Sequence, residues 1–140
     1  MNICIINGPN LNLVGRRQPE IYGEIYFEEY LEKLIQKYPA INFTYYQSNV
    51  EGELINQLQE TGFLSDGIIL NAGAYTHTSV AIADCITSIS SKVIEVHISN
   101  ILNREEFRHS SLIAKACEGS IIGLGINGYE LALMYFIEFQ

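Results

Sequence analysis

The four arginines of this chain fall in two short regions, although the chain as a whole is acidic. Arg16 and Arg17 stand side by side in GRRQPEIYG (residues 15–23), and Arg104 and Arg108 lie close together further along. With 8 Lys and Arg residues against 16 Asp and Glu residues, the formal net charge is −8. A guanidinium group presents a rigid fork of donors that suits carboxylates and phosphates. Surface pairing with neighbouring glutamates is the alternative, but four arginines in two regions favour an anionic ligand.

Two histidines, His77 and His97, are candidates for acid–base catalysis. An imidazole titrates near neutral pH, so it can give or take a proton under ordinary conditions. Taken singly, each is more typical of a hydrogen-bonded structural histidine. A metal site built from His77, Asp84 and His97 is a further possibility, but the spacing matches no compact ligand motif. We therefore predict no metal.

These residues lie among short apolar runs that alternate with helical patterns. The runs are rich in Ile and Val and apolar nearly throughout, which is typical of strands covered on both faces. Strands are expected at residues 2–7, 41–47, 67–71, 92–98 and 120–125. Helices are expected at residues 27–38, 48–62, 78–90, 104–116 and 129–139.

The alternation of strands and helices predicts an α/β fold with right-handed crossovers. Five strands in 140 residues favour a flavodoxin-like, doubly wound parallel sheet of order 2-1-3-4-5, with helices on both faces. Ser48 and Glu51 have the spacing of a capping box, and Thr78 or Ser79 is expected to cap the helix that follows. Because no repeat or linker is evident, we expect one domain over residues 1–140.

Polar residues gather where the predicted strands end. Asn, His, Ser, Thr and Gly are frequent in these exits, and all four arginines lie in two of them. Ligands of open parallel sheets bind outside the carboxyl ends of the strands, so a site for a small polar molecule is expected there. GLGING (residues 123–128) matches a dinucleotide-binding pattern, but no later strand or acidic ribose partner can follow it. We predict a tight turn that brings backbone close to another segment.

Composition and charge narrow the range of partners. The net charge of −8 disfavours nucleic acid and anionic membranes, and no apolar run approaches the roughly 20 residues that span a bilayer. The start, MNICIING, has no basic segment typical of a signal peptide. Three cysteines without paired spacing suggest reduced thiols and a cytoplasmic protein.

Four long motifs, in this order, resemble the type II 3-dehydroquinate dehydratases. They are NGPNLNLVGRRQPEIYG, QSNVEGELI, ILNAGAYTHTSVAIAD and IEVHISNILNREEFRHSS, and the resemblance runs from Ile5 to about Leu133. The departures are small: Gln18 stands where the family often has Glu, and NILNREEF lacks a His that commonly precedes the arginine. The resemblance implies dehydration of 3-dehydroquinate to 3-dehydroshikimate by anti elimination through an enolate, without a Schiff base, metal or organic cofactor.

The resemblance also implies a role for each site residue. Tyr22 corresponds to the catalytic base, His97 to the general acid, and Arg17 to the arginine that helps to ionise the tyrosine. Asn10 matches the residue that holds a water against the enolate oxygen, and Glu95 matches the carboxylate that orients His97. The residues that match the substrate-binding set are Asn71, His77, Asp84, Ile98, Ser99 and Arg108.

Physical expectation agrees with the two proton-transfer roles. An ordinary tyrosine has a pKa of about 10, so it is a scarce base at neutral pH unless a guanidinium favours the phenolate. Glu95 lies two residues before His97, which puts both on one face of the same strand. The GRRQPEIYG loop would then act as a lid that brings Arg17 and Tyr22 over the substrate.

Asp84 lies more than a turn into the helix expected to begin near Ser79, so its reach to the site is doubtful within one subunit. The resemblance implies that the protein forms a homododecamer, a tetramer of trimers. In that assembly this aspartate completes the site of a neighbouring subunit. Three other interpretations stay open: a binding module without turnover, a catabolic enzyme of quinate breakdown, and a Schiff-base dehydratase. The last is disfavoured because no lysine lies at the strand exits.

Overall fold

A computed structural model describes residues 1–16, 20 and 24–139 of the chain. Its centre is a five-stranded sheet in the order β2-β1-β3-β4-β5, with every neighbouring pair parallel. The strands are β1 (Asn2–Asn7), β2 (Asn42–Gln47), β3 (Gly67–Asn71), β4 (Lys92–His97) and β5 (Gly119–Ile122). The predicted strand order is confirmed, and the first four strands match their predicted ranges to within one residue.

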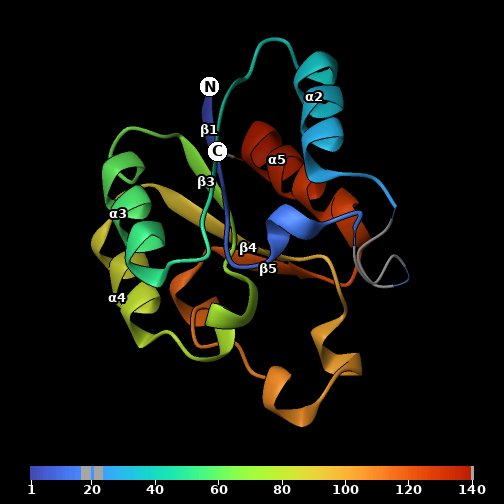
Figure 1. Cartoon of the computed structure of the whole chain (residues 1–140). Helices are drawn as coiled ribbons and strands as arrows, with labels where there is room; N and C mark the ends of the chain where they lie inside the picture. Colours follow the sequence, from blue (N-terminus) through green and yellow to red (C-terminus); the bar gives the residue numbers. More distant parts are fainter. Residues whose placement is uncertain (17–19, 21–23, 140) are drawn as a thin grey trace.

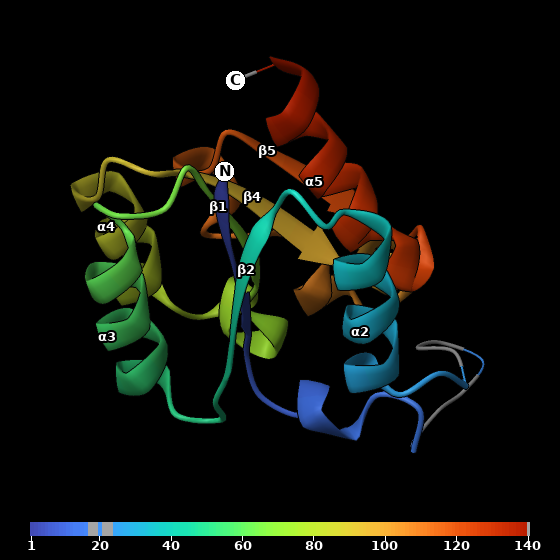
Figure 2. The ribbon, with the colours of Figure 1, turned by 90° about the horizontal axis from the view of Figure 1, so that it is seen from above.

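Helices cover both faces of this sheet. They are α2 (Phe27–Lys37), α3 (Glu51–Thr61), α4 (Val80–Ser88) and α5 (Gly128–Phe139). Figures 1 and 2 show α3 and α4 together on one face, and α2 and α5 together on the other. The three central strands are buried along almost their whole length, which accounts for their unbroken apolar sequences. The predicted doubly wound, flavodoxin-like arrangement is thus confirmed.

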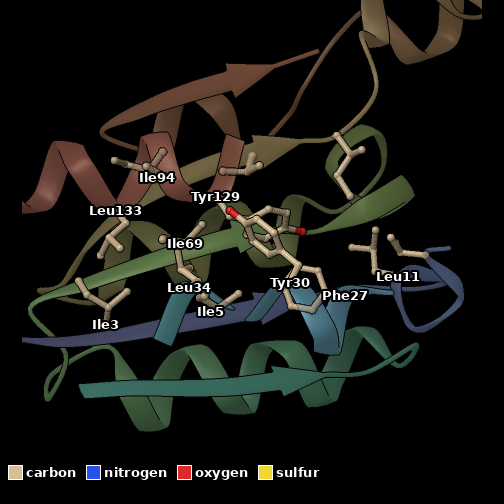
Figure 3. Close-up of a cluster of buried hydrophobic side chains, with 14 of the residues drawn as sticks. Ile3, Ile5, Leu11, Phe27, Tyr30, Leu34, Ile69, Ile94, Tyr129 and Leu133 are labelled. Carbon is tan, nitrogen blue, oxygen red and sulfur yellow. The ribbon is translucent and has the colours of Figure 1, made fainter. Parts of the chain in front are cut away.

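Aliphatic and aromatic side chains fill the layer between the sheet and the pair α2 and α5 (Figure 3). The rings of Phe27 from α2 and Tyr129 from α5 meet edge to face, with their centroids 5.0 Å apart. Aromatic pairs favour this geometry because the positive ring edge meets the negative ring face. Phe27, Tyr30 and Leu34 form the buried face of α2, whereas Ile35 is 43% exposed. The terminal helix α5 packs against the sheet.

The two helices on the other face begin differently. Ser79 is the N-cap of α4, as predicted, and its hydroxyl accepts a hydrogen bond from the third residue of the helix. The capping box predicted at Ser48 and Glu51 is wrong, because the N-cap of α3 is Val50 and has no side-chain cap bond. The Ser48 hydroxyl instead donates to the carboxylate of Glu53, so it fastens the entry of the helix without capping it.

The helix predicted at residues 104–116 is wrong. The structure has three short 3-10 turns along this part of the chain, η3 (Ile101–Asn103), η4 (Glu106–Arg108) and η5 (Ala114–Ala116). They leave the end of β4 as the orange segment in Figure 1. Backbone groups that a continuous helix would pair internally have tertiary partners, since the Leu112 N–H donates to the Thr76 carbonyl. The irregular backbone therefore serves contacts with the exit of β3.

The turn after β5 confirms the prediction made for GLGING. The predicted strand 120–125 ends at Ile122, and Gly123 and Gly125 then have φ values of +83° and +64°. A Cβ atom at Gly123 would lie 2.9 Å from the Cβ of Asn100. Because few residues other than glycine adopt positive φ, glycine allows this turn to pack directly on the exit of β4.

Candidate active site

A pocket of about 200 Å³ lies at the carboxyl ends of β1, β3 and β4. This is the edge of the sheet at which the sequence predicts a ligand site. Seven predicted site residues line it: Asn10, Asn71, His77, His97, Ile98, Ser99 and Arg108. The other lining residues are Pro9, Leu11, Val14, Gly73, Ala74, Ile101 and Arg104.

The exit of β1 forms one wall of the pocket, where the chain passes into the 3-10 turn η1 (Leu11–Leu13). Gly8 packs so closely on the exit of β3 that a Cβ atom would lie 2.5 Å from the carbonyl oxygen of Ala72. Asn10 follows in the left-handed conformation, with φ 68°, and its N–H donates to the side-chain oxygen of Asn49 at 3.0 Å. Asparagine tolerates this conformation better than most residues. These contacts fix the wall that carries the Asn10 side chain.

The exit of β3 contributes Asn71, whose amide is oriented from beneath by the last helix. Its side-chain nitrogen donates to the hydroxyl of Tyr129 at 2.9 Å, and its side-chain oxygen accepts from the N–H of Gly73 at 3.1 Å. Tyr129 in turn donates to the side chain of Asn7 at 2.7 Å. Burial raises the pKa of Tyr129, so this hydroxyl stays neutral. The Asn71 amide is therefore held in one orientation at the pocket floor.

His77 ends the 3-10 turn η2 (Gly73–His77) that follows β3. Its Nδ1 lies 2.8 Å from the carbonyl oxygen of Ser110. A carbonyl oxygen can only accept, so Nδ1 carries a hydrogen, and Nε2 is the ring nitrogen that Ser110 does not engage. The rings of His77 and His97 are stacked, with their centroids 6.4 Å apart. Two candidate proton-transfer groups thus lie in the same pocket.

His97 closes β4 and is only 5% exposed, with Glu95 fully buried behind it. The Nε2 atom of His97 lies 2.7 Å from Oε1 of Glu95. Burial by itself would raise the pKa of Glu95, but the hydrogen bond and charge of His97 and the hydroxyls of Thr76 and Ser120 lower it to about 2. Glu95 is therefore a carboxylate at neutral pH, and a carboxylate accepts, so Nε2 carries a hydrogen. Nδ1 is then the ring nitrogen that Glu95 does not engage.

Two guanidinium groups give the pocket a basic side. Arg104 and Arg108 both line it, and the Nε of Arg108 donates to the carboxylate of Glu105 at 3.0 Å. The nearby arginines contribute to lowering the pKa of Glu105, after a hydrogen bond from its own backbone. Glu105 is not among the lining residues. The lining therefore carries positive charge, which suits an anionic ligand as the sequence predicts.

Some predicted residues lie elsewhere. Asp84 is exposed on α4 and does not line the pocket, so within one chain it does not join His77 and His97. In the described part of the chain no group of three His, Cys, Asp or Glu side chains could hold a metal ion. Arg17, Tyr22 and most of the predicted lid at residues 15–23 fall outside the described residues.

Sequence reasoning missed three hydroxyl groups that contact Glu95. Thr76, Ser111 and Ser120 all donate to this carboxylate, and they lie 19, 16 and 25 residues from it in the sequence. No local spacing in the sequence connects these residues to Glu95. Only the register of β4 against β5, which pairs Glu95 with Ser120, could have pointed to one of them. Arg104 was noted among the clustered arginines but was not assigned to the site.

Comparisons with known proteins point to a single family. The family model described as dehydroquinase class II matches residues 1–137. A 3-dehydroquinate dehydratase from Fusobacterium nucleatum is 52% identical, over 99% of this chain and 98% of its own. Another from Exiguobacterium sp. is 49% identical, over 99% and 95%. The crystal structure of a type II dehydroquinase from Butyrivibrio crossotus superposes with a TM-score of 0.92 at 48% identity, covering 99% and 98%.

Proposed function

The chain belongs to the class II dehydroquinase family, and on that premise we propose how its pocket carries out the reaction. It is a hydro-lyase that dehydrates 3-dehydroquinate to 3-dehydroshikimate, a step of the shikimate pathway. One observation carries the assignment of this pocket: His97, which is hydrogen-bonded to the buried Glu95, lines the same cavity as two arginines. The pair supplies a proton donor, and the arginines supply a site for the carboxylate of the substrate.

Arg108 holds the substrate carboxylate in this proposal. Its side chain lines the pocket next to Ile98 and Ser99, at the exit of β4. A guanidinium can donate two parallel hydrogen bonds to one carboxylate, which fixes both position and orientation. Asn71 and His77 then contact the ring hydroxyls of the substrate from the exit of β3. Such contacts on several sides would keep the reacting carbon in one place.

His97 acts as the general acid. Hydroxide is a poor leaving group, so it must receive a proton as its bond to carbon breaks. With Nε2 bonded to Glu95, the proton is given from Nδ1, and Glu95 balances the charge of the imidazolium that donates it. Asn10, on the opposite wall, holds a water against the enolate oxygen that forms during the elimination. His97 and Asn10 line the pocket, and Glu95 acts from behind His97.

Tyr22 is the base in this mechanism, and Arg17 assists its ionisation. Both belong to the segment that joins η1, which contributes to the pocket wall, to α2. A proton next to a ketone is weakly acidic, so a phenolate is a suitable base if a neighbouring positive charge favours it. This assignment comes from the motif in which both residues stand, since they lie outside the described residues.

Asp84 completes the site of a second copy in this proposal. It is exposed on α4 and does not line the pocket of its own chain. Large apolar side chains are also exposed around this end of the sheet, among them Leu102, Phe107 and Leu124. A homododecamer built as a tetramer of trimers would cover such surfaces and present the aspartate to a neighbour. Light scattering at the elution peak of a sizing column measures this state directly.

The chain is proposed to work in the cytoplasm. It holds three free cysteines, as a reducing compartment favours. Among the described residues, the structure has no helix that is long and apolar enough to cross a membrane. Fractionation of cells that express the protein from its own gene would test the location.

The reaction is tested by adding 3-dehydroquinate to the purified protein and following the ultraviolet absorbance of the conjugated product. Wild-type protein forms the product, and His97→Asn and Tyr22→Phe each abolish most of the rate while circular dichroism stays unchanged. Tight binding without product in the wild type would instead indicate a binding module. Equal rates in wild type and Tyr22→Phe would remove Tyr22 as the base. Loss of activity after borohydride treatment with substrate would indicate a Schiff base.

A further inference from the structure

The carboxylate of Glu95 is held by more donors than the orientation of one imidazole requires. Its Oε1 accepts from His97 Nε2 at 2.7 Å, from Ser111 Oγ at 2.7 Å and from Thr76 Oγ1. Its Oε2 accepts from Ser120 Oγ at 2.7 Å. Such a set of donors keeps a fully buried carboxylate charged, because each hydrogen bond replaces water that burial has removed.

The two hydroxyls that share Oε1 also contact one another. Thr76 Oγ1 and Ser111 Oγ lie 2.8 Å apart, and Ser111 Oγ accepts from the N–H of Ala114 at 3.0 Å. Two hydroxyl hydrogens therefore serve three close oxygen pairs, namely both contacts to Glu95 and the contact between the hydroxyls. When either hydroxyl is removed, the other can give its hydrogen to Glu95 without competition. Either hydroxyl alone can therefore keep a hydrogen bond to Oε1 of Glu95.

Ser111 comes from the same segment as the anion-binding arginine. Arg108 lines the pocket three residues earlier, and the carbonyl of Ser110 holds Nδ1 of His77. The N–H of Leu112 donates to the Thr76 carbonyl at 2.7 Å. The stretch from Arg108 to Leu112 thus fixes Nδ1 of His77 directly, through the Ser110 carbonyl. It fixes Nε2 of His97 indirectly, because Ser111 bonds the Glu95 carboxylate that this nitrogen contacts.

We propose that Thr76 and Ser111 are positioning residues for His97, which act by holding the Glu95 carboxylate in place and in its charged form. This inference rests on the proposed role of His97 as the acid. Neither Thr76 nor Ser111 is among the residues that line the pocket. They fix which nitrogen of His97 carries the permanent hydrogen, so that the other nitrogen is the one that meets the leaving group. Ser111 also links this pair mechanically to the segment that carries the arginine.

The other ionisable groups near Glu95 do not hold its carboxylate in the way that the hydroxyls do. Burial, with a smaller effect of Glu95 itself, raises the pKa of the Cys117 thiol to about 12, so that thiol stays neutral. His77 faces the pocket from η2, and its Nδ1 is taken by a carbonyl. Arg104 and Arg108 line the pocket, and the carboxylate of Glu105 lies within ion-pair distance of both. The donors that can be altered without removing a pocket charge are therefore the hydroxyls, and Thr76 and Ser111 are the two that share Oε1.

The test compares Ser111→Ala, Thr76→Val and the double variant with wild type. Thr→Val keeps the branched shape of a fully buried side chain, and Ser91→Ala is the matched control, since its hydroxyl bonds a carbonyl at the opposite end of β4. Because of the shared hydrogens, each single variant lowers kcat about threefold or less, whereas the double variant lowers it by about 10- to 100-fold. KM stays within about twofold, since the substrate contacts are intact. Combining Thr76→Val with Ser111→Thr, which keeps a hydroxyl at residue 111, recovers most of the rate that the double variant loses.

A second readout does not depend on turnover. The Nε2–H resonance of His97, assigned by its loss in His97→Asn, reports on the hydrogen bond to Glu95 in proton and nitrogen NMR. It shifts in the double variant and not in Ser91→Ala. Unchanged kcat and an unchanged resonance in the double variant would overturn the proposal. So would a loss of kcat that only parallels a loss of thermal stability. If the double variant shifts the resonance but wild type makes no product, the positioning of His97 stands and its proposed catalytic role is removed.

Discussion

Glu95→Gln is expected to remove a defined part of the acid sensitivity of folding. The Glu95 carboxyl is fully buried, and its pKa falls from an ordinary 4.5 to about 2 because His97 and the surrounding hydroxyls outweigh the effect of burial. One unit of difference between the folded and unfolded pKa corresponds to about 1.4 kcal/mol. The ionised carboxylate therefore contributes about 3 kcal/mol to the free energy of unfolding at neutral pH.

The direction of the pH effect follows from the sign of this shift. Between pH 4.5 and about 2 the unfolded chain binds a proton at this residue and the folded chain does not. The contribution is thus complete above pH 4.5 and is lost as the pH falls toward 2. In Glu95→Gln the side chain cannot titrate, so the free energy of unfolding falls less steeply over this range. The variant is also less stable than wild type at pH 7, since an amide cannot accept all four hydrogen bonds.

The assay is urea unfolding followed by circular dichroism at several pH values from 7 down to 3. Glu60→Gln, which removes an exposed carboxylate on α3, is the control for the change in net charge. Over this range wild type and Glu60→Gln lose stability in parallel, and Glu95→Gln loses about 1 to 2 kcal/mol less, because only part of the titration lies above pH 3. Parallel curves for wild type and Glu95→Gln would refute the depressed pKa and the buried charge.

Three further outcomes are expected. In urea titrations Gly8→Ala lowers the free energy of unfolding by about 1–3 kcal/mol, because its Cβ atom would lie 2.5 Å from a backbone oxygen. A Cβ atom at Gly52 would have nothing within 4 Å, so Gly52→Ala leaves this free energy unchanged or raises it by up to about 1 kcal/mol. Tyr129→Phe removes the hydroxyl between two buried amides, lowers stability by about 1–3 kcal/mol and raises KM in the dehydration assay. Arg108→Lys keeps the charge but loses the paired donors, so KM rises about tenfold or more with a smaller change in kcat; an unchanged KM would exclude Arg108 from carboxylate binding.

The sheet was predictable because its signals are local. Residues 2–7, 67–71 and 92–98 are short apolar runs without a polar face, and a fully buried parallel strand has few other sequence forms. The exits of these strands carry the polar residues, so the position of the pocket followed from the topology. The predicted site residues at these strand ends, such as His97 and Asn71, therefore line the pocket.

The segment after β4 was not predictable in the same way. Residues 104–116 have a helical composition, but their backbone groups bond to η2, and Ser111 turns its hydroxyl toward Glu95. Helix propensity is a weak preference that such tertiary contacts outweigh. The capping box at Ser48 was wrong for a related reason, since its hydroxyl has a better acceptor in the carboxylate of Glu53. Asp84 is exposed on α4 and does not line the pocket of its own chain, which agrees with the doubt about its reach within one subunit.

The hydrogen bond between Tyr129 and Asn7 has a consequence for synthesis of the chain. The two residues are 122 positions apart, so Asn7 leaves the peptidyl transferase centre well before Tyr129 has been added. At translation rates of roughly 5–20 residues per second, this delay is about 6 to 24 s. During that time the face of β1 and β3 that α5 will cover has no partner from the last helix, and the Asn71 amide is not yet oriented. The pocket is therefore completed only after translation of a helix that contributes no residue to its lining.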